Sequence, residues 1–149
     1  MNKILNYVKI NELISTSGQP KIEELELIAN EGFEVVINLA VPTTSNALEN
    51  EDKIVSSLNM SYIHIPVDFE NPKISDLKLF LNILQALGAN KVWIHCAKNY
   101  RVSAFMYVYH KYILHTPFEQ IDLSIFDKWQ PSLVWQELMK VQLEDLYKV

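Results

Sequence analysis

Short apolar runs alternate along the chain with longer stretches of helical spacing. The apolar runs Phe33–Leu39 and Val92–Ile94 predict buried strands, and Met60–Pro66, in which Tyr62 and His64 alternate with Ile63 and Ile65, predicts a further strand. Stretches with apolar residues three or four positions apart predict helices, and they are Lys21–Glu31, Leu48–Leu58, Ser75 (the expected N-cap) to about Leu87, and a stretch from about Arg101. This alternation predicts an α/β domain with a parallel sheet and a site at the carboxyl ends of its strands.

The two ends of the chain add further predicted elements. Tyr7–Ile14 predicts one or two short edge strands. Ser15–Pro20 predicts a turn-rich loop, which either caps the next helix or lies on the rim of the site. Pro117 stands near the start of a predicted helix that ends at about Trp129, and Ser132–Tyr147 predicts a last amphipathic helix.

Composition limits the classes of function. The length of 149 residues predicts a single domain, residues 1–149, with a substantial core. A net charge of −5 without a basic stripe argues against nucleic-acid binding. No apolar stretch is long enough to span a membrane, and one cysteine cannot form an internal disulfide, so we expect a cytoplasmic protein without a membrane partner. The four histidines and the cysteine lack metal-ligand spacing, and we expect no metal or cofactor.

The cysteine, Cys96, lies where a predicted strand meets a predicted helix, and Arg101 stands at the start of that helix. Backbone N–H groups and the helix dipole favour both a bound anion and the thiolate, which is the nucleophilic form of cysteine. An arginine adds a charged fork for a phosphoryl group. We therefore expect a nucleophile and an anion cradle in one structure. Its substrate-binding residues would be His95, Ala97, Lys98, Asn99 and Tyr100.

A lone cysteine after an apolar strand is more often a small buried hydrophobic residue. His95, Arg101 and Ser103, all within seven residues of Cys96, favour the chemical interpretation. Ser103 is expected to donate a hydrogen bond to the sulfur. His95 is expected to orient the loop through backbone contacts rather than to bind a metal.

Phosphoryl transfer to a cysteine also needs a proton for the departing alkoxide, which a carboxylic acid can supply. Asp68 follows the carboxyl end of a predicted strand and is the expected acid, with Glu70 as second candidate. The alternative is that Asp68 is an exposed loop residue that caps or stays solvated.

This pattern resembles the cysteine-dependent protein tyrosine and dual-specificity phosphatases, and more closely the small bacterial phosphatase-like proteins of the DUF442 type. The similar segments span nearly the whole chain, and they are Ser17–Pro20, Gly32–Leu39, Tyr62–Phe69 and His95–Phe105. The resemblance implies a three-layer α/β fold, with a four- or five-stranded, mostly parallel sheet between helices, and no metal. It also implies a phosphocysteine intermediate on Cys96, a catalytic Arg101 and an acid at Asp68.

The cysteine loop departs from the signature of that family. Four residues instead of five separate Cys96 from Arg101, and Val102 stands between Arg101 and Ser103. One residue is about 100° around a helix, so Arg101 reaches a phosphate only if the loop is rebuilt. The loop also lacks glycine, and Asn99 is the residue that can replace it in a left-handed conformation.

Three functions follow from these features. The first is a cysteine phosphatase that acts on a phosphorylated protein or small molecule. The second is a weak or inactive relative whose loop binds phosphate, sulfate or a phosphorylated partner. The third is a rhodanese-like sulfurtransferase, because such enzymes also place one cysteine in a loop before a helix.

Overall fold

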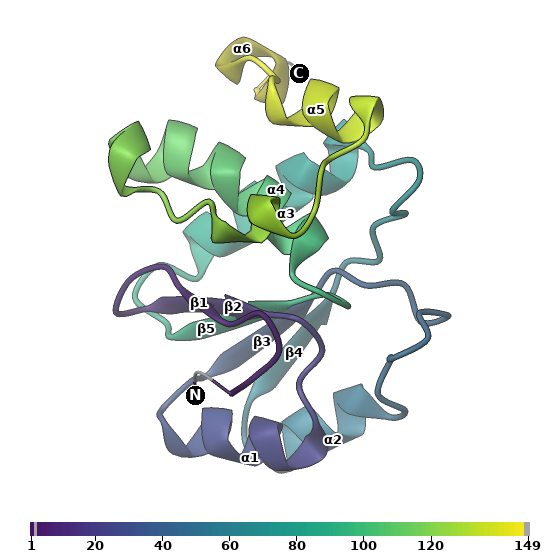
Figure 1. Ribbon diagram of the computed structural model, residues 1–149. Helices are drawn as coiled ribbons and strands as arrows, with labels where there is room; N and C mark the ends of the chain where they lie inside the picture. The colour runs from purple at the N-terminus through teal and green to yellow at the C-terminus, as the bar shows by residue number, and fades with distance from the viewer. Residues whose placement is uncertain (2, 148–149) are drawn as a thin grey trace.

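The computed structural model describes residue 1 and residues 3–147. Its centre is a five-stranded sheet with the strand order β1-β2-β5-β3-β4 (Figure 1). The strands are Val8–Lys9 (β1), Ile14–Ser17 (β2), Val35–Asn38 (β3), Ser61–His64 (β4) and Val92–His95 (β5). β1 pairs antiparallel with β2, and all other neighbours are parallel. The predicted, mostly parallel α/β sheet is confirmed.

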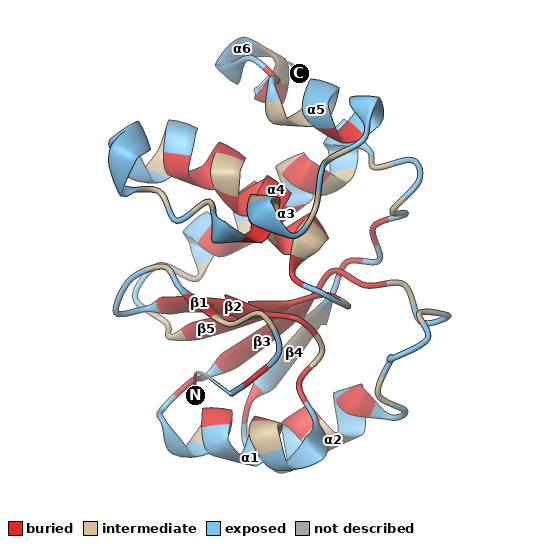
Figure 2. Ribbon diagram, viewed as in Figure 1, coloured by how far each residue is buried: buried red, intermediate tan, exposed pale blue. Residues whose placement is uncertain are grey.

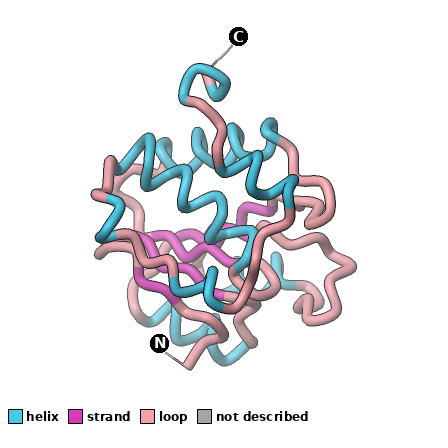
Figure 3. Tube along the Cα trace, turned by 45° about the horizontal axis from the view of Figure 1, so that its top comes forward, coloured by secondary structure: helices cyan, strands magenta, loops and turns pink. Residues whose placement is uncertain are grey.

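Helices cover both faces of this sheet (Figures 1 and 3). Below it in Figure 1 lie α1 (Ile22–Asn30) and α2 (Glu51–Ser57). Above it lie α3 (Ile74–Ala86), α4 (Tyr100–Tyr109), α5 (Leu133–Met139) and α6 (Leu143–Leu146). This arrangement gives the three layers that the family resemblance implied.

The alternation of side chains along β5 divides the core into two clusters. Trp93 is fully buried with Leu25 and other residues of the lower layer. Ile94, the next residue, is fully buried with Phe105 and other residues of the upper layer. Successive residues of a strand point to opposite faces, so a strand covered on both faces is buried at every position. The three inner strands β2, β5 and β3 are accordingly buried at every position (Figure 2).

The register of the sheet places three strand ends side by side. His95, the last residue of β5, stands opposite Ser17 of β2 and Asn38 of β3. The loops that follow these strands therefore emerge at one edge of the sheet. In parallel α/β sheets, sites form at this edge.

The N-terminal prediction was wrong in one respect, because Ser15–Ser17 is part of β2 and not of a loop. The hydroxyl groups of Thr16 and Ser17 have partners within the sheet region, which allows their burial. The Thr16 hydroxyl donates to the carbonyl of Val8 (3.3 Å), and the Ser17 hydroxyl accepts from the indole N–H of Trp93 (2.8 Å).

The two helices predicted near the C-terminus were also wrong. The first is reduced to two 3₁₀ segments, Phe118–Gln120 and Ser124–Asp127. Between them the Asp122 carboxylate accepts the Ser124 N–H (2.9 Å), a local bond that competes with helix formation. The second is divided at Val141, which is buried and whose carbonyl accepts the hydroxyl of Tyr112 (2.7 Å).

The expected N-cap of α3 was wrong too, because Ser75 lies inside the helix, after Ile74. Lys73 is the N-cap and makes no side-chain cap bond, while Asp76 in the first turn complements the helix dipole. Within the described part of the chain, no helix is both long and apolar enough to cross a membrane.

Candidate active site

Strand β5 leads directly into a pocket of about 200 Å³ at the start of α4. Its lining consists of Phe69 and of five residues around the cysteine loop, namely Cys96, Ala97, Lys98, Tyr100 and Arg101. Only 1% of the surface of Cys96 is exposed, so the pocket is where this thiol meets solvent. The structure thus brings together most of the residues predicted to form the site.

The carbonyl groups of the cysteine loop are held by groups that do not line this pocket. The carbonyl of Cys96 lies 3.1 Å from the Nδ1 atom of His95. The carbonyl of Ala97 accepts the N–H of Gln19 and the side-chain amide of Asn46, both at 3.0 Å. The carbonyl of Lys98 accepts the side-chain amide of Asn6, also at 3.0 Å.

With its carbonyls held in this way, the loop keeps N–H groups available. Within the described part of the chain, the N–H groups of Ala97, Lys98 and Asn99 have no acceptor. The first N–H groups of α4 add to these donors, because Asn99 precedes the helix without forming a side-chain cap. Unpaired loop amides beside the positive end of a helix dipole form an anion-binding concavity.

Arg101 supplies the charge of the pocket. Its side chain is 7% exposed, and its Nε and Nη1 atoms have no hydrogen-bond partner among the described residues. The guanidinium carbon Cζ lies 5.3 Å from the centre of the Phe69 ring. A buried cation without an anionic partner is unfavourable, so these two N–H groups suit a bound anion. Despite the shortened loop, Arg101 lies in the same pocket as Cys96.

Asn99 adopts the left-handed conformation expected for it (φ 68°, ψ 12°). Its side chain is fully buried and lies away from the pocket lining, with the Nδ2 group donating to the carbonyl of Asn6 (2.8 Å) and to the hydroxyl of Thr16 (3.0 Å). Ser103 donates its hydroxyl to the Oδ1 atom of Asn99 (3.3 Å). This geometry differs from the predicted bond between Ser103 and the sulfur of Cys96.

His95 is fully buried and does not line the pocket, so it lies behind the loop rather than beside a substrate. Its Nε2 atom lies 2.6 Å from Oε2 of Glu51, the first residue of α2. Oε1 of Glu51 accepts the side-chain amide of Gln19 (2.5 Å). Burial alone would raise the pKa of Glu51, but the hydrogen bond and charge of His95, with bonds from Gln19 and Tyr62, hold this pKa below its ordinary value. Glu51 is therefore a buried carboxylate that fixes the ring of His95.

Sequence reasoning missed Glu51 and Phe69. Glu51 is one of several acidic residues near the start of α2, and only the fold separates it from the exposed Asp52 beside it. Phe69 follows the expected acid directly, but a lone aromatic residue in a loop carries no signal of its own. The turn-rich segment Ser15–Pro20, which was predicted either to cap a helix or to lie on the rim of the site, includes Gln19. It was the sequence feature that indicated residues able to hold the cysteine loop in place.

Asp68 and Glu70 lie outside the pocket lining, on either side of Phe69. Asp68 is exposed, and its carboxylate accepts the N–H of Glu70 (2.9 Å). Phe69 itself is held by Trp135, whose indole N–H donates to the Phe69 carbonyl (2.7 Å). The expected acid is thus one residue from the pocket wall.

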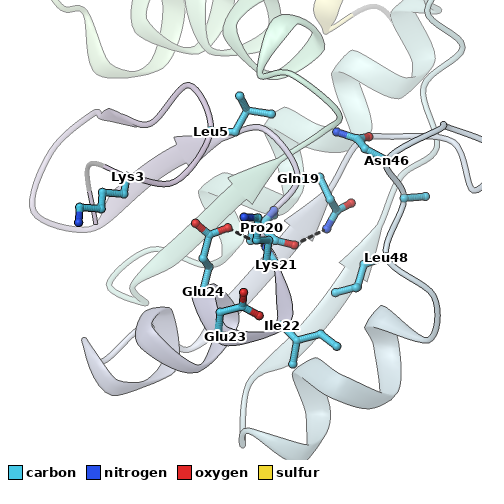
Figure 4. A pocket seen from close by; sticks show the side chains of 11 residues that line it. Lys3, Leu5, Gln19, Pro20, Lys21, Ile22, Glu23, Glu24, Asn46 and Leu48 are labelled. Carbon is cyan, nitrogen blue, oxygen red and sulfur yellow. Dashed lines mark hydrogen bonds between the residues drawn. The ribbon is translucent and has the colours of Figure 1, made fainter.

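The residues on the open side of the loop are Lys98, which is exposed, and Tyr100, which is half-buried. The ring of Tyr100 stacks on that of Trp129, with centres 5.1 Å apart and planes 3° apart. A separate hollow of about 650 Å³ lies beside Gln19, Pro20 and Asn46 (Figure 4). Cys96 does not line this second hollow.

Gly18 lies behind the loop at a position where a side chain does not fit. A Cβ atom there would lie 2.7 Å from the carbonyl oxygen of Ala97 and 2.9 Å from the side chain of Leu5. This close approach of two backbones lets Gln19 bond the loop. Among the described residues, no group of three or more His, Cys, Asp or Glu side chains is placed to hold a metal ion.

Comparisons with known proteins place this geometry in a family. Residues 8–130 match the model of a family described as DSP-PTPase phosphatase fused to NAD+ kinase. A search of curated proteins gives no match. Among solved structures, a candidate phosphatase of the DUF442 type from Shewanella putrefaciens CN-32 is 30% identical, with 93% of this chain and 91% of that chain covered and a TM-score of 0.86.

Two further structures share the fold at lower identity. Tk-PTP in its active form is 19% identical, with 91% of this chain and 94% of that chain covered and a TM-score of 0.73. TpbA of P. aeruginosa is 14% identical, with 95% and 88% covered and a TM-score of 0.74. Because the family match spans most of the chain and the Shewanella protein shares 30% identity over nearly all of it, the chain belongs to the DSP-PTPase phosphatase family.

Proposed function

We propose that the protein is a phosphomonoester hydrolase that works through a phosphocysteine intermediate on Cys96. The observation that carries this proposal is the buried Arg101, which lines the same pocket as Cys96 and whose Nε and Nη1 groups have no hydrogen-bond partner among the described residues. A buried guanidinium without hydrogen-bond partners destabilises the free protein. Binding of a dianionic phosphoryl group offsets this cost because it provides acceptors and opposite charge. The unpaired amides of Ala97 and Lys98 support the same ligand.

In the first step, the Cys96 thiolate attacks phosphorus, so an S–P bond forms and the P–O bond to the leaving group breaks. Arg101 and the loop amides hold the non-bridging oxygens, where charge rearranges in the transition state. We assign to Asp68 the proton that the leaving oxygen receives. In the second step, Asp68 takes a proton from water, which attacks phosphorus and releases phosphate and the thiolate.

His95 and Glu51 act in this proposal through the loop and not on the substrate. The Nδ1 atom of His95 contacts the carbonyl of Cys96, and Glu51 fixes the opposite edge of the ring. In the described part of the chain, the Ser103 hydroxyl contacts the loop through its hydrogen bond to Asn99. These residues are therefore positioning residues, whereas Cys96 and Arg101 contact the reacting group.

The substrate is a phosphorylated protein or small molecule. One solved structure of P. aeruginosa TpbA is a complex with phosphotyrosine, and SIW14 of S. cerevisiae is described as a PP-IP phosphatase. At 14% and 15% identity, these neighbours share the fold with this chain and do not select its substrate.

One observation favours a second function, the binding of a phosphorylated partner without turnover. Among the described residues, no carboxylate lines the Cys96 pocket, and the carboxylate of the exposed Asp68 accepts the N–H of Glu70. A site that holds the anion but lacks a placed acid would bind phosphate and react slowly, most of all with poor leaving groups.

Hydrolysis of para-nitrophenyl phosphate, measured without metal and with reductant, tests the proposal. We expect turnover by the wild-type protein and none by Cys96→Ser, while tungstate binds to both. Turnover that persists in Cys96→Ser would overturn the proposal. Tungstate binding without turnover in the wild type would instead support the binding function.

A further inference from the structure

Asn6 connects three separate segments of the chain at the back of the cysteine loop. Its side-chain Nδ2 group donates to the carbonyl of Lys98 (3.0 Å), and its Oδ1 atom accepts the ammonium group of Lys128 (2.7 Å). Its own carbonyl accepts the side-chain amide of Asn99 (2.8 Å). Of the four loop residues between Cys96 and Arg101, Asn6 therefore bonds two.

The chemistry of these partners defines the orientation of the Asn6 amide. A carbonyl can only accept and an ammonium group can only donate, so the NH₂ group must face Lys98 and the oxygen must face Lys128. No other side chain of similar size offers a donor and an acceptor in this arrangement. An aspartate would keep the acceptor and lose the donor.

The backbone of Asn6 is equally specific. It adopts φ 51°, in the left-handed region where asparagine is tolerated better than most residues. The preceding carbonyl, that of Leu5, accepts the N–H of Gly18 (2.7 Å), which ties this turn to the end of β2. The backbone of Asn6 is thus held in place next to the cysteine loop.

We propose that Asn6 is a positioning residue of the phosphate site. By holding the carbonyl of Lys98 and the side chain of Asn99 on the far side of the loop, it turns the loop N–H groups towards the pocket. The loop has only four residues between Cys96 and Arg101 and no glycine, so its own backbone offers little to define this direction. This inference rests on the proposed anion site and adds a residue distant in sequence to it.

The test compares tungstate affinity, measured by titration calorimetry, between the wild type and Asn6→Gly. Glycine keeps the left-handed backbone and removes both side-chain bonds without adding charge. Asn59→Gly is the matched control, because Asn59 is exposed, has φ 62° and makes no described side-chain hydrogen bond. Lys128→Met removes only the second Asn6 bond, and para-nitrophenyl phosphate turnover and thermal unfolding are followed in parallel.

We expect tungstate to bind about tenfold more weakly to Asn6→Gly, which corresponds to the loss of one loop hydrogen bond. Asn59→Gly should bind like the wild type, and Lys128→Met should lose less affinity than Asn6→Gly. A role of Asn6 in folding alone would lower the unfolding temperature and leave the affinity of the folded protein unchanged. If Asn6→Gly does not fold, Asn6→Ser, whose shorter side chain cannot reach both partners, replaces it.

The outcomes separate this inference from the proposed function. Wild-type protein that binds tungstate and turns over, together with Asn6→Gly of equal affinity, would overturn the role of Asn6 and leave the phosphatase proposal standing. Wild-type protein that neither binds tungstate nor turns over would overturn both.

Discussion

The guanidinium of Arg101 lies over the ring of Phe69, with Cζ 5.3 Å from the ring centre. Cation–π attraction of this kind contributes about 0.5–2 kcal/mol and holds the arginine side chain in the pocket before any anion arrives. Phe69 in turn contacts the rings of Trp129 and Trp135, at 5.7 and 5.9 Å between centres. The arginine is therefore placed by an aromatic group built from two distant parts of the chain.

Replacement of Phe69 tests this placement. We expect Phe69→Leu to weaken tungstate binding about threefold to tenfold, because the ring attraction is lost while apolar volume is kept. Phe69→Tyr keeps an aromatic face and should bind nearly as the wild type does. Calorimetric titration of the three proteins gives the comparison, and equal affinity for Phe69→Leu would show that the ring does not position Arg101.

Arg101 should lower the stability of the free protein while it provides the anion-binding group of the pocket. Arg101→Met removes a buried guanidinium with two unpaired nitrogen atoms, so we expect the free energy of unfolding to rise by about 1–3 kcal/mol. The same variant should lose tungstate binding and turnover.

Urea denaturation with and without tungstate measures both effects. Tungstate should raise the unfolding midpoint of the wild type and leave that of Arg101→Met unchanged. A variant less stable than the wild type in the absence of anion would contradict the view that Nε and Nη1 of Arg101 lack hydrogen-bond partners in the free protein.

The lowered pKa of Glu51 makes the stability of the fold depend on pH in a defined direction. A carboxyl group with a lower pKa in the folded than in the unfolded state stabilises the fold above its ordinary pKa of 4.5, and this stabilisation is lost as the pH falls further. Glu51→Gln keeps the shape and removes the charge beside His95. We expect it to be less stable than the wild type at pH 7 by about 3 kcal/mol.

This difference in the free energy of unfolding should shrink as the pH falls below 4.5. Urea denaturation of both proteins at pH 7, 4 and 3 measures it. Glu49→Gln, on an exposed residue two positions away, is the control for an added amide. A difference between wild type and Glu51→Gln that stays constant with pH would exclude the charged pair as its source.

Asp68 tests the assignment of the acid. Asp68→Asn should slow turnover by about 10²–10⁴-fold for alkyl phosphates, whose leaving groups need a proton, and much less for para-nitrophenyl phosphate in its first step. Glu70→Gln should have little effect on either substrate. Equal rates of wild type and Asp68→Asn on both substrate classes would remove Asp68 from the mechanism.

Much of this fold follows from local pattern. The runs around Ile37 and Ile94 have only one stable environment, a strand covered on both faces, and so they predicted the sheet correctly. Cys96 and Arg101 could be assigned to one pocket because a strand, a short loop and a helix N-terminus are adjacent in sequence. The prediction of two helices in segment 117–147 was wrong because the burial of Val141 and the local turn at Asp122 depend on contacts that are not visible in the helical spacing of apolar residues.

The residues that hold the cysteine loop from behind could not be predicted from the sequence, for a related reason. Glu51 is 44 residues from His95, and Asn6 is 92 residues from Lys98. Neither has a sequence environment that differs from that of an ordinary surface residue. The antiparallel pairing of β1 with β2 brings Asn6 to the carboxyl end of β2, and the parallel register of β3 and β5 brings the segment before α2 to the same edge of the sheet.

The covalent intermediate is the most direct test of the central claim. The protein would be mixed with para-nitrophenyl phosphate, quenched in acid during turnover, digested and analysed by mass spectrometry. We predict phosphate on Cys96 in the wild type, more of it in Asp68→Asn because the second step is slowed, and none in Cys96→Ser. Sustained turnover with no phosphate on Cys96 in either the wild type or Asp68→Asn would contradict the mechanism.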